Sequence, residues 1–148
     1  MFDCASTNVK LYVSKIMKLP TNLDSDGFIT KFFIFTIKDL RNAVAHNNVI
    51  FDTRFKTGKI DKRLVNLLEK EVGVSNLNFN YMDAYVIMIT YFLRKMGETK
   101  TSCKQFVAAY QQQTEYLRNE LPIGVCNQIL GTQHRSNINT LQKFISKS

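Results

Sequence analysis

Apolar residues recur at steps of three or four along most of this chain of 148 residues, which is the spacing of one face of an α-helix. Alternation of apolar and polar residues, the pattern of a half-buried strand, is nowhere sustained. Six glycines and two prolines are few for a β architecture rich in turns. The sequence therefore predicts an all-α fold, a bundle of four to six helices. At this length one core buries about two-thirds of the unfolded surface, so residues 1–148 are expected to form a single domain.

Two helices are expected to lie side by side at the centre of this bundle, over residues 28–46 and 81–96. The second is apolar on nearly every side, and Asn80 and Asp83 resemble a capping box at its start. Ser102 and Gln105 form a similar capping pair before another helix. The remaining helices are predicted from these signals: a cap at Ser6 or Thr7, an amphipathic row over 60–72 that ends at Gly73, Pro122 in a first turn, and apolar residues over 138–145.

The helix predicted over Phe28–Ala45 carries two rows of side chains at helical spacing. One row is apolar throughout and is predicted to face the core: Ile29, Phe33, Ile37, Leu40 and Val44. The other row starts with Phe28, Phe32 and Phe35 and ends with Asp39, Asn42 and His46. A row that changes from apolar to polar indicates burial at one end and a polar site at the other. The alternative is a solvated last turn, where the helix dipole favours His46.

Arg41, Asn42 and His46 bring a cation, an amide and an imidazole to one helix end. Asn42 and His46 lie one turn apart on the same face, and His46 is one of only two histidines. Arg41 lies about 100° round the helix, and its long side chain can still reach the same pocket. This combination indicates chemistry on a phosphate group.

The net charge of +8 and a pI near 9.5 favour an anionic partner. The basic residues are scattered rather than gathered in a tail, so ordinary solubility explains the excess equally well. Together with the cluster of Arg41, Asn42 and His46, the charge favours RNA.

Three cysteines, Cys4, Cys103 and Cys126, are widely separated and form no C-x-x-C pair, so neither a disulfide framework nor a zinc site is indicated. Cys103 and Cys126 are expected to be buried thiols. No bound metal or cofactor is expected. The chain shows no membrane-spanning run and no signal pattern, so we expect a cytoplasmic protein without membrane contact.

The phenylalanine-rich helix running into Leu40-Arg41-Asn42 and Ala45-His46, then Phe51-Asp52 and Arg54, resembles the abortive-infection (Abi) proteins of bacterial phage defence. These proteins belong to the HEPN superfamily. Its mark is an arginine, a polar residue and, after four to six intervening positions, a histidine. The chain resembles the C-terminal half of a longer Abi protein. The resemblance therefore implies a HEPN-like bundle that acts with a further N-terminal domain or stands alone.

The resemblance implies metal-independent cleavage of RNA by a homodimer in which two copies of the motif meet. Arg41, Asn42 and His46 would then be the catalytic residues. His46 would act as acid or base and Arg41 would hold the phosphate. Asp39 is either a supporting residue or only a helix charge. Asn47 would support the site, and Lys38 and Arg54 would bind substrate. The further partner would be either a neutralising antitoxin or the N-terminal domain of a longer protein.

Two alternatives stay open. A HEPN-like module can dimerise, or bind RNA or protein, without cutting. A helical domain outside this superfamily can also place His46 at a helix end by chance.

Overall fold

The computed structural model describes residues 5–19, 24–46 and 60–148, and these residues form helices and their connections without a strand. The predicted all-α bundle is confirmed. The described residues contain seven helices where four to six were expected, and the signal at Pro122 corresponds to the short helix α6. Their bounds are α1 Thr7–Ile16, α2 Phe28–Ala45, α3 Lys62–Val72, α4 Met82–Met96, α5 Lys100–Glu120, α6 Ile123–Leu130 and α7 His134–Lys147.

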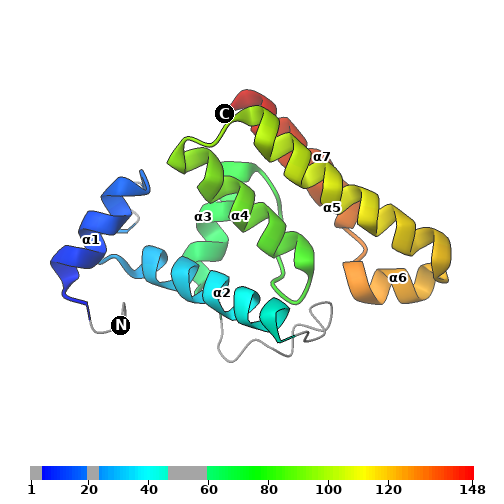
Figure 1. The fold of residues 1–148 in the computed structure, drawn as a ribbon, viewed down its shortest axis with the longest axis horizontal. Helices are drawn as coiled ribbons and strands as arrows, with labels where there is room; N and C mark the ends of the chain where they lie inside the picture. The colour runs from blue at the N-terminus through cyan, green and yellow to red at the C-terminus, as the bar shows by residue number, and fades with distance from the viewer. Residues whose placement is uncertain (1–4, 20–23, 47–59) are drawn as a thin grey trace.

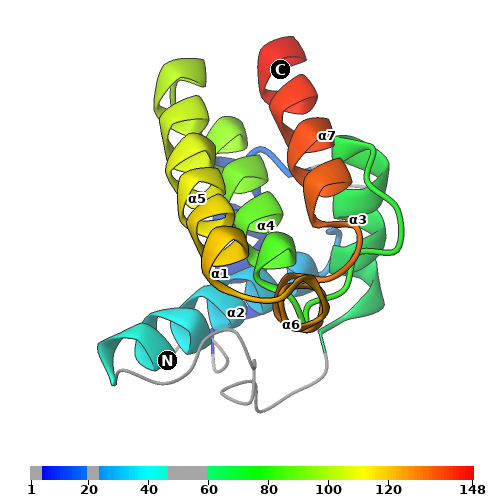
Figure 2. The ribbon, with the colours of Figure 1, turned by 90° about the vertical axis from the view of Figure 1, so that its right-hand side faces the viewer.

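Helix α4 forms the centre of the bundle. Of its 15 residues, 10 are buried, including Tyr85, Tyr91 and Phe92. Figure 2 shows α4 enclosed between α5 on one side and α3 and α7 on the other. Helices α5 and α7 lie side by side and run in opposite directions, and α6 joins them at one end (Figure 1). The central position predicted from the apolar pattern of 81–96 is therefore confirmed.

Helix α2 packs against α4 but lies at the edge of the bundle (Figure 2), so the expectation that it shares the centre with α4 is wrong. The rings of Phe33 and Phe92 stack with their centroids 3.7 Å apart, which confirms that the two helices are neighbours. The apolar row of α2 faces the core at Ile29, which is 2% exposed, but Val44 is 57% exposed. The expectation that Val44 faces the core is wrong, because in the last turn of α2 the neighbouring Ala43, which is 1% exposed, is buried instead.

A buried carboxylate fixes the start of α2. Asp24 is 1% exposed and accepts hydrogen bonds from the backbone N–H of Ile29 at 2.7 Å and of Thr30 at 3.2 Å. The hydroxyls of Ser14 and Thr30 also donate to it, each at 2.6 Å. Asp24 thus satisfies free N–H groups of α2 and ties this helix to α1.

Both predicted capping pairs are wrong. Helix α4 begins after Tyr81, and the Asn78 side chain accepts from the Asn80 N–H at 2.9 Å within the preceding turn. Asp83 faces the interior instead, where it has buried partners. Helix α5 begins one turn earlier than expected, since Thr99 is its N-cap and accepts from the Ser102 N–H at 3.1 Å.

Candidate functional site at the end of helix α2

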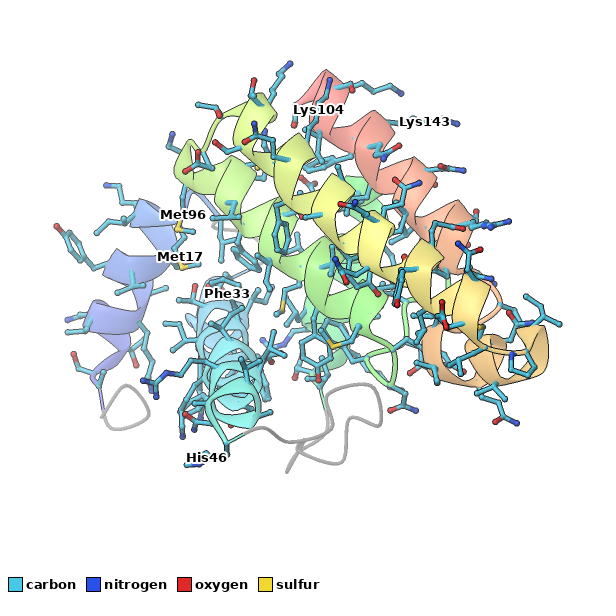
Figure 3. The ribbon with its side chains drawn as sticks, turned by 45° about the vertical axis from the view of Figure 1, so that its right-hand side comes forward. Met17, Phe33, His46, Met96, Lys104 and Lys143 are labelled. Carbon is cyan, nitrogen blue, oxygen red and sulfur yellow. The ribbon has the colours of Figure 1, made fainter. Side chains whose placement is uncertain are left out.

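The last turn of α2 brings Arg41, Asn42 and His46 together. Arg41 Nη1 donates to Asn42 Oδ1 at 3.3 Å, and the backbone N–H of His46 donates to the Asn42 carbonyl at 3.0 Å. Arg41 and His46 are exposed, while Asn42 is half-buried. Figure 3 shows His46 at the tip of α2, pointing away from the bundle. A guanidinium and an imidazole in one exposed turn are both open to a phosphate in solution.

Asp39 lies on the bundle side of this turn. It is half-buried, and its charge acts on Tyr85 of α4. Burial of Tyr85 and, secondarily, the Asp39 carboxylate raise the pKa of this phenol to about 12. Asp39 therefore stands between the exposed motif turn and the core.

The other predicted site residues are less closely associated with the turn. Lys38 is exposed, and its Nζ lies 5.4 Å from the centroid of the Phe35 ring. Asn47 and Arg54, like Phe51, Asp52 and Cys4, lie outside the described residues. The described part of the motif is therefore Arg41, Asn42 and His46, with Asp39 behind them.

A second polar cluster, which sequence reasoning missed, lies inside the bundle. Asp83 of α4 and His134 of α7 are joined by a contact of 2.7 Å between Asp83 Oδ1 and His134 Nδ1, and both are nearly inaccessible. The Tyr110 hydroxyl donates to Asp83 Oδ1 at 2.9 Å, and Asn137 Nδ2 lies 3.5 Å from Asp83 Oδ2. His134 Nε2 contacts the Thr114 hydroxyl at 3.0 Å. The cluster thus connects α4, α5 and α7.

This cluster has the order carboxylate, imidazole, hydroxyl, but its geometry is unsuited to nucleophilic catalysis. Thr114 is 2% exposed and, unlike Asp83, does not line the cavity beside the cluster, so a substrate has no access to its hydroxyl. Both ring nitrogens of His134 are already in hydrogen-bond contact. Burial, and then the neighbouring Asp83 charge, raise the pKa of Tyr110 well above its usual range, so Tyr110 stays a protonated donor. The cluster therefore holds the three helices together.

One signal in the sequence could have revealed the cluster. Asp83 is the one carboxylate in a helix that is apolar on nearly every side, and a buried carboxylate requires donors. His134, with Asn137 one turn on, supplies such donors on a later helix. The capping-box interpretation of Asp83 gave it a local partner and so removed the need for a distant one.

Cys103 and Cys126 are buried free thiols, as predicted. In the described part of the chain, no group of three His, Cys, Asp or Glu side chains is placed to hold a metal ion. Within the same residues, none of the helices is both long and apolar enough to cross a bilayer.

Comparison with protein-family models, with curated proteins and with solved structures found no match to this chain. The chemistry of the α2 turn and the resemblance of its motif to HEPN proteins are the features that indicate a function.

Proposed function

We propose that this protein is a metal-independent endoribonuclease of the HEPN type, which acts as a homodimer in an abortive-infection or toxin-type defence system of bacteria. One observation carries the proposal. The Arg41 guanidinium donates a hydrogen bond to the Asn42 side chain, and His46 lies one helical turn after Asn42 at the end of α2, where Arg41 and His46 are both exposed. The net charge of +8 favours the approach of a polyanion such as RNA.

Each of the three side chains has a role in this proposal. The ribose 2′-oxygen attacks the adjacent phosphorus, the bond from phosphorus to the 5′-oxygen breaks, and a cyclic 2′,3′-phosphate forms. His46 of one protomer takes the proton from the 2′-hydroxyl, and His46 of its partner gives one to the leaving 5′-oxygen. Arg41 binds the phosphate oxygens and stabilises the charge that develops on them. Asn42 orients Arg41 through the hydrogen bond of 3.3 Å that Asn42 Oδ1 accepts from Arg41 Nη1.

The first prediction concerns substrate and metal. The protein is expected to cut RNA equally well with and without EDTA, because the attacking group is the substrate's own hydroxyl. DNA of the same sequence is expected to stay intact, because it lacks that hydroxyl. Gel analysis of end-labelled RNA and DNA, each with EDTA or magnesium, measures both. Cleavage that requires magnesium would contradict the mechanism, and RNA binding without cleavage would favour the non-catalytic module.

The second prediction concerns the dimer. Val44 is 57% exposed in the same turn as Arg41, and a second copy packed about a twofold axis would cover both Val44 side chains and bring the two motifs together. Burial of a valine contributes about 1.5–3 kcal/mol. Val44→Asp is therefore expected to weaken the dimer by about 100-fold, since two valines are lost, and to reduce cleavage in parallel.

Sedimentation velocity over a range of protein concentrations measures this effect. Val125→Asp is the matched control, because Val125 is an exposed valine on α6, 40% accessible and away from the motif. A wild-type protein that stays monomeric at micromolar concentration, or a Val44→Asp variant that dimerises normally, would refute the assembly.

A further inference from the structure

A small pocket lies beside the Asp83–His134 cluster, on elements other than the α2 turn. It has a volume of about 200 Å³ and is formed by the segment before α4, the start of α4, the α6–α7 connection and the start of α7. We call it the Asp83 pocket. Its polar walls come from carboxamides, a phenol and the buried carboxylate: Asn76, Asn78, Gln133, Asn137, Tyr81 and Asp83. Leu77, Ala84 and Leu130 add apolar surface.

Asp83 lines this pocket although only 2% of the residue is exposed, and it has acceptor capacity left. Its Oδ1 already receives the Tyr110 hydroxyl at 2.9 Å and contacts His134 Nδ1 at 2.7 Å. Its Oδ2 has one long contact among the described residues, 3.5 Å to Asn137, and Asn137 also lines the pocket. A carboxylate accepts about four hydrogen bonds. Oδ2 is therefore suited to a ligand that presents an N–H donor.

The size and walls of the pocket restrict the ligand further. Pockets for drug-sized ligands measure about 300–1,000 Å³, so this one takes a smaller group. The carboxamides offer both donors and acceptors, while the leucines and the Tyr81 ring suit a flat apolar face. Carboxylates accept from the cytosine amine, and Asn or Gln side chains pair with the adenine edge. A planar base with an exocyclic amine satisfies all of these groups.

We propose that the Asp83 pocket binds a nucleobase that carries an exocyclic amine, with Asp83 and Asn137 contacting its amine edge and the ribose left outside. The base can come from a free nucleoside or from an unpaired nucleotide of RNA, since both present the same edge. The proposal does not depend on cleavage at the α2 turn. The pocket and the turn belong to different elements, so each can be tested without the other.

Titration of the ¹⁵N-labelled full chain, followed by NMR, tests the proposal. The probes are adenosine, guanosine and cytidine, with uridine as the nucleoside without an exocyclic amine and ribose 5-phosphate as the probe without a base. At least one amine-bearing nucleoside is expected to shift the amide resonances of Thr132, Gln133 and Asn137. Uridine and ribose 5-phosphate are expected to bind about 10-fold more weakly or not at all. Short homopolymeric RNAs test the second source of the base.

Two variants locate the binding. Asn137→Ala removes the amide beside Asp83 Oδ2, and Thr132→Trp places a bulky ring at the rim, where Thr132 is exposed and its replacement leaves the core unchanged. Each is expected to weaken nucleoside binding by about 10-fold. Asn139→Ala is the matched control, because Asn139 is exposed on the same helix and does not line the pocket. Thermal unfolding of each variant verifies that the fold is kept.

Each result decides between the alternatives. Shifts with nucleosides support a free ligand, and shifts at the same residues with oligonucleotides alone support an unpaired base of RNA. His46→Ala is expected to bind nucleosides as the wild type does, which separates this site from the proposed nuclease. No shifts at millimolar concentration of any probe, equal binding of uridine, or binding that persists in Thr132→Trp would overturn the proposal.

Discussion

His46→Ala is expected to reduce RNA cleavage by about 100-fold or more while RNA binding is largely kept. The reason is that His46 is the acid or base of the proposed reaction, whereas Arg41 and the general positive charge supply most of the attraction for phosphate. Its exposed position at the end of α2 makes the substitution harmless to the core. Single-turnover cleavage and filter binding on the same RNA measure the two effects separately.

Arg41→Ala has a different signature that serves as the companion test. It is expected to weaken both cleavage and binding, since it removes a charge that contacts the scissile phosphate. Arg135→Ala is the matched control, because Arg135 is an exposed arginine on α7 paired with Glu115 at 2.8 Å. If His46→Ala cuts as fast as the wild type, or if Arg135→Ala loses as much activity as Arg41→Ala, the assignment of the site is wrong.

Asp83→Ala is expected to destabilise the fold by about 3–5 kcal/mol. The substitution removes the acceptor of the Tyr110 hydroxyl, of His134 Nδ1 and of the Asn137 amide, and leaves the buried His134 and the half-buried Tyr110 and Asn137 without this partner. Urea denaturation followed by circular dichroism measures the free energy of unfolding. A loss below about 1 kcal/mol would show that the cluster contributes little to stability.

A pair of tyrosine variants provides the internal comparison for that measurement. Tyr110→Phe is expected to cost about 1–2 kcal/mol, because it deletes the hydroxyl bonded to Asp83. Tyr91→Phe is expected to be neutral or slightly stabilising, since the Tyr91 hydroxyl is buried without a hydrogen-bond partner among the described residues. Equal losses in the two variants would mean that aromatic packing, and not the bond to Asp83, determines the result.

The helices were predictable because their signals are local. Spacing of apolar residues located α2, α3 and α4, and Gly73 and Gly97 mark the ends of α3 and α4 in the left-handed conformation. The burial of Cys103 and Cys126 followed from the same rows. These features depend on residues within a few turns of one another.

The predictions that were wrong concern contacts between segments that are distant in the sequence. Asp83 has the local pattern of a cap, yet its partners lie 27 and 51 positions away, at Tyr110 and His134. Val44 belongs to an apolar row, yet Ala43 beside it is the residue that is buried, and the packing of distant segments decides which of the two is covered. The motif at the end of α2 is partly local. Arg41, Asn42 and His46 lie close together in the sequence and could be predicted from it, but the second copy proposed to complete the site could not be predicted from a local pattern.

The chemical form of the RNA ends tests the central claim most directly. Mass spectrometry of a short RNA cut by the wild-type protein in EDTA identifies the group at each new end. Attack by the 2′-hydroxyl with His46 as proton donor predicts 2′,3′-cyclic phosphates and 5′-hydroxyls, which disappear in His46→Ala and at any linkage with a single 2′-deoxy substitution. Products with 5′-phosphate ends, or products that form only after magnesium is added, would contradict it.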